Sequence, residues 1–289
     1  MFALRIFTAF AISIVFCLIS PPAAHAAESY DNCTGFITSV PATITTQGTW
    51  CMSSDLATGL TSGNAISIDT NNVTINCNDF KLGGLSAGLG TLAYGMRASN
   101  RLNVTVRNCN IRGFYIGVDF FGGSSGGHAV EDSRFDGNTY EAIDVTGDGS
   151  VIRRNRVSAT GGGTVNSSVY AINSYDSVDI LDNTVSGTVA RATSNGAAYG
   201  IFAFGSDASV RGNRVRGTLK DGTGVNYGIF NASSLRVIMR DNEVVGVADV
   251  GSIGLRCTNA NGSAADNTIS GFETAISGCA NDGGNVIKP

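Results

Sequence analysis

Short stretches of alternating apolar and polar residues follow one another along most of the chain, and two sequence patterns recur among them. One pattern places a small residue before an aliphatic one, as in Gly200-Ile201 and Gly228-Ile229. The other is Asn-x-Val or a variant of it, as in Asn213-Arg214-Val215. The stretches are too brief for helices and lack helical periodicity, so they predict β-strands separated by tight corners.

The second pattern recurs at intervals of 22 to 31 residues, and a period of this length that tolerates insertions is typical of a solenoid. One coil cannot bury its own apolar side, so equivalent strands should stack in parallel about 4.8 Å apart. The predicted fold is therefore all-β, a single-domain parallel β-helix of about eight to nine coils. The copies begin at Asn78, Cys109, Ser133, Asn155, Asn183, Asn213, Asn242 and Asn267.

The first 26 residues predict a secretory signal peptide. Arg5 precedes a largely apolar run, and Ala24-His25-Ala26 is a small-residue cleavage site. The apolar run is shorter than the roughly 20 residues of a membrane-spanning helix, so no membrane span is expected after cleavage. Residues 27–62 are expected to cover the first coil, 63–279 to form the β-helix and 280–289 to form a C-terminal tail, because uncovered ends would expose unpaired strand edges.

Charge and cysteine content limit the cellular compartments and the classes of partner that the sequence favours. The net charge is −4, and it becomes −5 once Arg5 is removed, which does not favour a nucleic-acid partner. The six cysteines that remain after cleavage favour three disulfides in an exported, secreted or periplasmic protein, and their spacing does not fit zinc. Positions in adjacent coils predict the pairs Cys33–Cys51, Cys77–Cys109 and Cys257–Cys279.

The repeated phrases resemble those of right-handed parallel β-helix proteins of the pectin-lyase-like superfamily, over about residues 63–279. The right-handed coiling is implied by that resemblance. The polygalacturonase-like catalytic pattern of that superfamily is not matched, because the chain contains neither Gly-His-Gly nor Arg-x-Lys. A lyase-like arrangement of acids around Ca²⁺, with Arg97 as the nearby cation, is less completely excluded.

Outward positions are informative because the core does not dictate them. The residue after the aliphatic position forms a column that should line one face of the solenoid. Two acids stand next to each other in this column, with an arginine before them and two phenylalanines after them. The column runs Ser67, Arg97, Asp119, Asp144, Asn173, Phe202, Phe230, Arg256 and Ser277.

Connection lengths place the acids in a notch. The connections entering this strand are long at 84–93, 160–169, 188–198 and 218–226, and nearly absent at 114–115 and 138–140. Asp119, Glu141 and Asp144 belong to the two coils with short connections. Glu141 is also the one acid in a neighbouring column that is otherwise mostly Tyr and Ile, and such departures from a structural column often mark function.

Carboxylates about 5 Å apart suit a nucleophile with an acid/base partner acting on a sugar, or a shared Ca²⁺ site. Crowding should raise the pKa of one of them. The structural alternative is a pair of solvated acids balanced by Arg97 and Arg134. The catalytic candidates are Arg97, Asp119, Glu141 and Asp144, and the binding candidates are Asn173, Phe202, Phe230 and Arg256.

Charged columns on another side allow a plainer interpretation. Arg107, Glu131 and Arg153 alternate in sign, and so do Asp132 and Arg154, which favours simple pairing between neighbouring strands.

Three functions remain open. The first is an exported protein that binds a polysaccharide or cell-surface glycan without a complete catalytic site. The second is a polysaccharide lyase, hydrolase or epimerase that uses the acidic notch, and the third is a structural spacer in an envelope.

Overall fold

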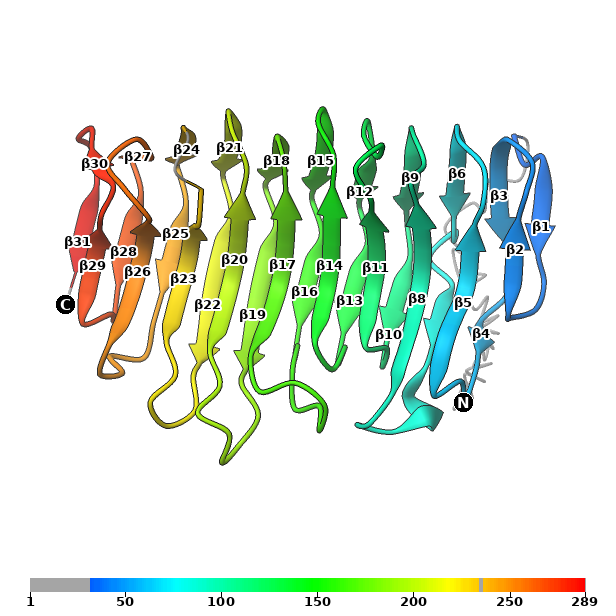
Figure 1. Ribbon diagram of the computed structural model, residues 1–289, viewed down its shortest axis with the longest axis horizontal. Helices are drawn as coiled ribbons and strands as arrows, with labels where there is room; N and C mark the ends of the chain where they lie inside the picture. The colour runs from blue at the N-terminus through cyan, green and yellow to red at the C-terminus, as the bar shows by residue number, and fades with distance from the viewer. Residues whose placement is uncertain (1–31, 234–235, 289) are drawn as a thin grey trace, which may run out of the picture.

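The computed structural model describes residues 32–233 and 236–288, which form a solenoid of three parallel β-sheets with about nine turns. Strands of successive coils lie side by side along the long axis, from β1 at one end to β31 at the other (Figure 1). One short 3₁₀ helix, η1 (Leu85–Ala87), lies in the connection between β7 and β8. The predicted all-β parallel β-helix is confirmed.

Each coil contributes one strand to each sheet. Sheet A contains β1 (Gly35–Ile37), β3 (Gly48–Met52), β6 (Val73–Asn76), β9 (Val104–Arg107), β12 (Ala129–Glu131), β15 (Ser150–Arg153), β18 (Val178–Leu181), β21 (Ala208–Arg211), β24 (Val237–Arg240), β27 (Ser263–Ala265) and β30 (Ala280–Asn281). Sheet B, which faces the viewer in Figure 1, contains β2 (Ala42–Ile44), β5 (Ser62–Ile68), β8 (Leu92–Ser99), β11 (Ile116–Phe121), β14 (Glu141–Thr146), β17 (Val169–Tyr175), β20 (Ala198–Phe204), β23 (Asn226–Asn231), β26 (Ser252–Cys257) and β29 (Thr274–Ser277). Sheet C contains β4 (Leu56–Ala57), β7 (Lys81–Gly83), β10 (Asn110–Arg112), β13 (Arg134–Asp136), β16 (Arg156–Ser158), β19 (Thr184–Val189), β22 (Arg214–Leu219), β25 (Glu243–Val245), β28 (Thr268–Ser270) and β31 (Val286–Lys288).

The sheets extend beyond the expected limits of the β-helix. Strands β1 to β4 pair with later coils, so residues 35–57, which were expected to cover the first coil, are themselves part of the solenoid. At the other end, β30 and β31 add strands to sheets A and C in place of the expected tail. The predicted signal peptide, residues 1–26, lies outside the described residues.

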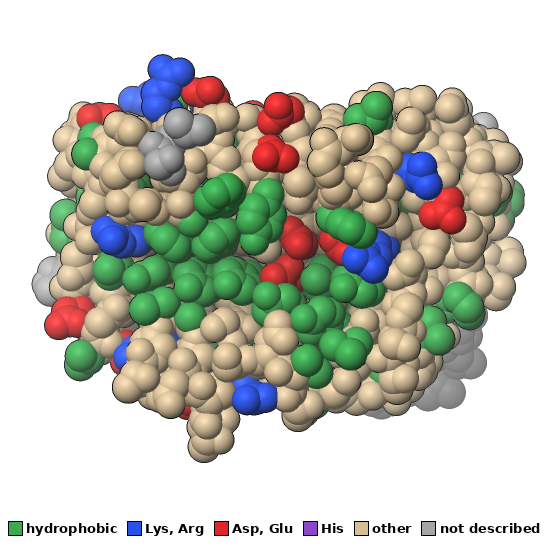
Figure 2. All heavy atoms as spheres, viewed as in Figure 1, with side chains coloured by type: hydrophobic (Ala, Val, Ile, Leu, Met, Phe, Trp, Pro, Cys, Tyr) green, Lys and Arg blue, Asp and Glu red, His purple; other side chains and the backbone are tan. Residues whose placement is uncertain are grey.

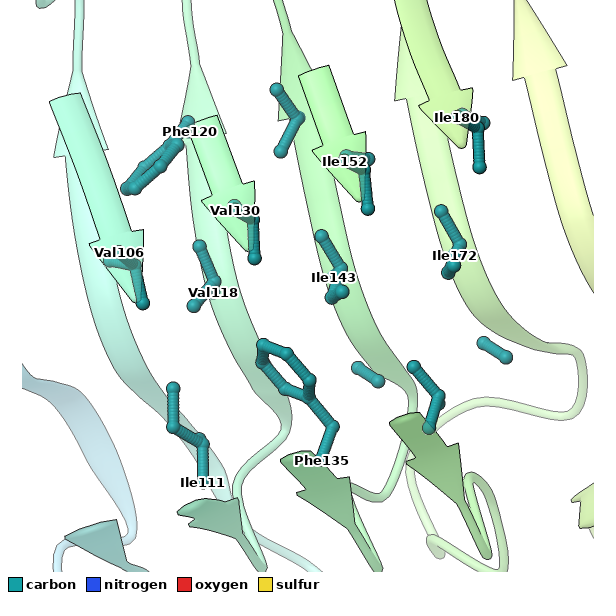
Figure 3. Close-up of a cluster of buried hydrophobic side chains, with 14 of the residues drawn as sticks. Val106, Ile111, Val118, Phe120, Val130, Phe135, Ile143, Ile152, Ile172 and Ile180 are labelled. Atoms are coloured by element: carbon teal, nitrogen blue, oxygen red, sulfur yellow. The ribbon is translucent and has the colours of Figure 1, made fainter. Parts of the chain in front are cut away.

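The core consists of stacked columns of like residues from all three sheets. Figure 3 shows Val130 and Ile152 of sheet A, Ile143 and Ile172 of sheet B, and Phe135 of sheet C pointing into the shared interior. All of these side chains are fully buried. The glycine before the sheet B aliphatic of β20 is required by the next coil, since a Cβ on Gly200 would lie 2.6 Å from the Gly228 carbonyl oxygen. Burial of each Ile or Val contributes about 1.5–3 kcal/mol.

A ladder of buried asparagines closes the corner between sheets A and C. The backbone N–H and side-chain amide of Asn183 both donate to Oδ1 of Asn213, at 2.9 and 3.0 Å, and the same arrangement repeats from Asn155 to Asn267. The residue before each ladder position has positive φ, as at Asp182 (55°) and Asp241 (55°). Asp, Asn and Gly tolerate this left-handed conformation best, which explains their recurrence there.

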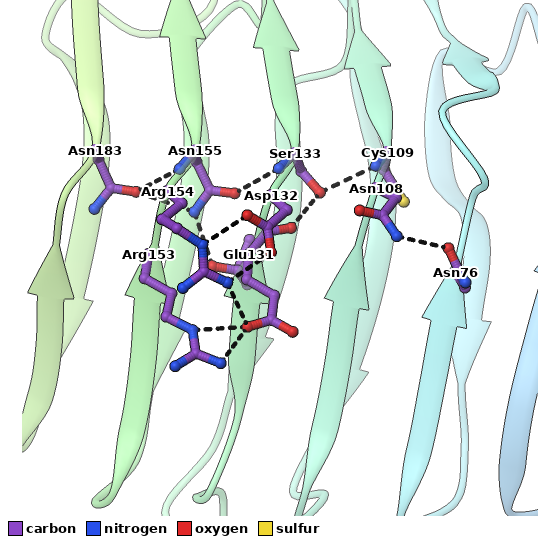
Figure 4. A network of polar contacts seen from close by, with 11 residues as sticks. Asn76, Asn108, Cys109, Glu131, Asp132, Ser133, Arg153, Arg154, Asn155 and Asn183 are labelled. Carbon is purple, nitrogen blue, oxygen red and sulfur yellow. Dashed lines mark hydrogen bonds and ion pairs between the residues drawn. The ribbon is translucent and has the colours of Figure 1, made fainter. Parts of the chain in front are cut away.

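The first repeat departs from the aligned sequence. Ile111 pairs with Leu82 rather than with Phe80, because the corner after β6 is two residues longer than the later corners. The alternating charges of sheet A pair with each other as expected. Arg153 reaches Glu131 at 2.6 Å, and Arg154 reaches Asp132 at 2.7 Å (Figure 4).

The three predicted disulfides are confirmed, at Cys33–Cys51, Cys77–Cys109 and Cys257–Cys279. The last two join neighbouring coils at the end of a strand, where their Cα atoms are 4.7 and 4.9 Å apart. Over residues 32–233 and 236–288, the structure has no helix that is long and apolar enough to cross a membrane.

The ladder predicts a large local cost for one substitution. Asn213→Ala should lower the free energy of unfolding by about 2–4 kcal/mol, because the amide groups of Asn183 lose their acceptor and the Ile180 carbonyl loses its donor. Denaturant unfolding monitored by circular dichroism measures this change. Ser209→Ala, on the outer side of β21, is the control and should change stability by less than about 0.5 kcal/mol. Equal effects of the two substitutions would contradict a stabilising role for the ladder.

Candidate functional site

The outward column predicted from the sequence lies on sheet B in the expected order. Parallel pairing places Arg97 beside Asp119, Asp119 beside Asp144, and Asp144 beside Asn173. The column continues through Phe202 and Phe230 to Arg256. Stacking of the strands has therefore placed residues that are up to 159 positions apart in the chain in one column on the surface. The functional roles of these residues stay predictions.

The loops at one edge of sheet B form a wall beside this column. The connections at 113–115 and 137–140 are short, and those at 84–91 and 159–168 on either side are long, as expected. The two long loops meet across the short ones, where the Thr164 amide donates to the Leu89 carbonyl at 3.0 Å. The notch is therefore closed at its edge. Tyr115 lies beneath this bridge, and its hydroxyl accepts a hydrogen bond from Asn166 at 3.0 Å.

Arg97 forms an ion pair at one end of the acidic residues. Its Nε donates to Oδ2 of Asp119 at 2.7 Å. The guanidinium also lies between two aromatic rings, 4.1 Å from the centre of Tyr94 and 4.3 Å from that of Phe121. Asp119 is almost completely enclosed, whereas the Arg97 side chain is 31% exposed, so this ion pair is shielded from solvent only on the side of the carboxylate.

Glu141 and Asp144 form a second, closer pair of acids. Glu141 is buried to 2% exposure and Asp144 is half-buried. The Asn173 amide donates to Oε1 of Glu141 at 3.3 Å. The other oxygen of Glu141, Oε2, is enclosed without a protein hydrogen-bond partner, and so are Oδ1 of Asp144 and Oδ1 of Asn173. We refer to Asp119, Glu141 and Asp144 together as the acid cluster.

The pKa values of the acid cluster are all raised. Burial raises the pKa of Asp119 to about 6, and the Arg97 charge limits this rise. Burial, with the Asp119 charge, raises the pKa of Asp144 to about 7. Burial and the nearby Asp144 charge raise the pKa of Glu141 well above its usual range. Two neighbouring carboxyl groups disfavour each other's charged form, so one of the two is expected to stay protonated near neutral pH.

An aromatic surface continues from the acid cluster along sheet B. Tyr170 stacks on Tyr199 with ring centres 4.6 Å apart, and the Phe202 ring meets both edge-on. Phe230 and Tyr227 extend the row by one more coil. Figure 2 shows a hydrophobic band across this face, with acidic side chains within it and basic side chains near both ends. We call these five residues the aromatic floor.

The tyrosines are the residues that the sequence predictions did not select. The column that contains Glu141 also contains Tyr94, Tyr170, Tyr199 and Tyr227. The sequence showed this column, but no function was predicted for its tyrosines. Their position three residues before Arg97, Asn173, Phe202 and Phe230 was the available signal. Only the structure shows that two consecutive buried residues, such as Gly200 and Ile201, separate the members of each pair, so that both members reach the outer surface.

A metal site and a catalytic histidine are the two other kinds of chemistry considered. Among residues 32–233 and 236–288, no group of three or more His, Cys, Asp or Glu side chains has an arrangement suited to a metal ion. Calcium binding by the acids thus stays a prediction. His128 is buried to 1% exposure, accepts a hydrogen bond from the Val104 amide, and packs against Phe120, which is a structural position. Burial lowers its pKa to about 4.

Comparison with known proteins yields matches in structure alone. No protein-family model matches the sequence, and no curated protein matches it. The A-module of the Azotobacter vinelandii mannuronan C-5 epimerase AlgE6 is similar over 89% of this chain and 91% of its own, with 12% identity and a TM-score of 0.45. A mutant tailspike protein of E. coli bacteriophage HK620, in complex with a hexasaccharide, is similar over 88% of this chain, with 12% identity and a TM-score of 0.50.

These similarities concern the fold. The tailspike similarity at a TM-score of 0.50 identifies the solenoid as a right-handed parallel β-helix, as the sequence resemblance implied. The chain spans 55% of the length of that tailspike chain and 60% of another tailspike structure, which matches with 13% identity and a TM-score of 0.47.

The raised pKa values predict that the acid cluster destabilises the fold at neutral pH. A carboxyl group with a raised pKa stabilises the folded state fully below its unfolded pKa of about 4, and this contribution is lost as the pH rises towards about 7. Glu141→Gln should therefore raise the melting temperature at about pH 8, by roughly 2–4 °C for each kcal/mol gained, and change it little at about pH 4. Thermal unfolding over this pH range measures the effect.

Glu131→Gln is the matched control, because Glu131 is paired with Arg153. It should give no gain at high pH. A lower melting temperature for Glu141→Gln at about pH 8 would show that Glu141 is instead stabilised as a charged group.

Proposed function

We propose that the protein is exported and binds an extended polysaccharide along the outer face of sheet B. The observation that carries this proposal is the aromatic floor, a row of partly exposed rings over three successive coils beside the acid cluster. Aromatic rings offer large apolar faces to the C–H faces of sugars, while a few fixed polar groups orient the hydroxyls. Asn173 and the acid cluster supply such groups at one end of the floor.

The position of the wall supports a chain-like ligand. The long loops at 159–168, 190–197 and 220–225 follow one another along the same edge of sheet B, parallel to the solenoid axis (Figure 1). Tyr175 and Phe204 are exposed neighbours at the opposite ends of strands β17 and β20. A ligand lying along the axis would contact the floor between these two borders. The tailspike structure with a TM-score of 0.50 holds a hexasaccharide on a similar fold.

Export is supported by the leader sequence and by the three disulfides. Disulfides persist in oxidising compartments, which fits an extracellular or periplasmic protein. A cell-surface or extracellular glycan is available there.

Cleavage of the bound polysaccharide is the second candidate function, and the raised pKa values of Glu141 and Asp144 favour it. A carboxyl group with a pKa of about 7 can hold a proton at neutral pH and donate it to a glycosidic oxygen as the C–O bond breaks. At such close range the second carboxylate would attack the anomeric carbon and form a glycosyl ester, which a water deprotonated by the first carboxylate would then hydrolyse. The net reaction is addition of one water across one glycosidic bond.

The binding proposal is tested with the floor itself. Phe202→Ala combined with Phe230→Ala should weaken binding of an oligosaccharide found in a glycan-array screen by at least about tenfold, because two stacking faces are lost. Isothermal titration calorimetry measures the affinity. Ile238→Ala, which removes an exposed apolar side chain from β24 on sheet A, is the control and should leave the affinity unchanged. If both variants bind like the wild type, sheet B is not the binding face.

The cleavage proposal is tested with Asp144→Asn. This substitution keeps the shape of the side chain and removes its proton chemistry, so turnover should fall by at least about a hundredfold while the affinity changes little. Reducing-sugar release is measured together with calorimetric binding. Asp69→Asn, an exposed acid at the end of β5, serves as the control and should retain wild-type turnover. A wild-type protein that binds a saccharide and releases no reducing ends would leave binding as the whole function.

A further inference from the structure

The charges around the acid cluster determine which kind of polysaccharide the face can hold. We propose that this face selects an uncharged polysaccharide and rejects polyuronates, whose sugar units each carry a carboxylate. This inference rests on the proposed function, because it concerns the ligand of the same face.

Arg97, the cation next to Asp119 in the column, is already balanced by that acid. Its Nε donates to Asp119 at 2.7 Å, and the guanidinium lies against the rings of Tyr94 and Phe121. The side chain is 31% exposed, but its charge offsets that of Asp119 and leaves the charge of Glu141 and Asp144 uncompensated. Arg256, the other cation of the column, lies four strands beyond Asp144, which is about 19 Å at a strand spacing of about 4.8 Å. It also donates a hydrogen bond to Ser277 at 3.1 Å.

The unpartnered polar atoms of the cluster are hydrogen-bond acceptors. Asn173 is 3% exposed, its amide nitrogen donates to Glu141, and its Oδ1 is enclosed without a protein donor. Oε2 of Glu141 and Oδ1 of Asp144 are enclosed in the same way, and the one proton that these two acids retain can serve only that pair. A sugar hydroxyl donates a hydrogen bond to such oxygens, whereas a carboxylate has none to donate. The site therefore complements hydroxyl groups in both charge and hydrogen bonding.

The aromatic floor adds no positive charge that could balance a ligand carboxylate. Its five residues are Tyr and Phe, and burial raises the pKa of Tyr170 and Tyr199, so the floor stays uncharged. A polyuronate has a carboxylate on every unit, so it cannot lie along the face without placing one close to the acid cluster. Like charges at short range in a partly enclosed site repel each other strongly, and this repulsion is the physical basis of the selection.

The test compares ligands that differ in charge alone. Oligogalacturonides are used as free acids and as methyl esters, together with the neutral hexasaccharides of cellulose, mannan, xylan and chitin. Binding to the full mature chain is measured by calorimetry near neutral pH at low salt. At least one neutral saccharide should bind, and every free polyuronate should bind at least about tenfold more weakly than the corresponding ester or not measurably.

A double variant identifies the cause of the selection. Glu141→Gln with Asp144→Asn removes the charge of the pair and keeps its size, so the ratio of the affinity for the free polyuronate to that for its ester should rise by about tenfold. Asp69→Asn with Glu243→Gln removes equivalent charges elsewhere on the surface and should alter neither affinity. Melting temperatures show that both variants are folded.

The outcomes separate this inference from the proposed function. If a free polyuronate binds as tightly as its ester, and the Phe202→Ala/Phe230→Ala variant loses that binding, the polysaccharide face stands and the charge selection is wrong. If no saccharide of either kind binds to the wild type, the proposed function fails and the selection fails with it. If polyuronates bind weakly to both the wild type and the double acid variant, the acid cluster is not the cause and the inference is overturned.

Discussion

Parallel stacking of equivalent residues is the constraint on which the rest of this structure depends. Each coil pairs with the next in register, so every position in a repeat has the same position above and below it. Inside, this produces the aliphatic columns and the asparagine ladder, in which each amide satisfies the backbone of its neighbour. Outside, the same register turns residues that are distant in the chain into one continuous surface. The order of the surface column follows from the order of the core columns.

The acid cluster lies where this regularity is interrupted. Glu141 replaces the tyrosine found at the same position in four coils, and it stands beside Asp144 rather than beside a cation. Close burial of carboxyl groups disfavours their charged forms, so the cluster opposes folding at neutral pH. Strain of this kind often marks functional sites, where activity needs groups that stability alone would replace. The ion pairs of sheet A show the contrasting arrangement, in which each acid meets an arginine.

The aromatic floor and the wall give the cluster its context. Three successive coils present Tyr or Phe on sheet B, and the loops between sheets C and B are long in these coils. A ligand would meet apolar stacking area on one side of the cluster and the enclosed Arg97–Asp119 pair on the other. This asymmetry gives the face a direction along the solenoid axis. Binding, cleavage and charge selection can therefore be tested separately, with substitutions in different parts of one surface.

The sequence by itself determined the β-helix, the three disulfide pairs and the order of the column from Arg97 to Arg256, because a repeat aligned with itself already states which residues stack. It misplaced the ends of the solenoid, since strands β1 to β4 and β30 to β31 lack the repeated phrases and are recognisable only by their pairing. Tertiary structure alone decided the enclosure of Asp119 and Glu141, the capture of Arg97 between two rings, and the contact of the Thr164 and Leu89 loops across two coils. These features depend on side-chain directions and loop paths, which strand register does not specify.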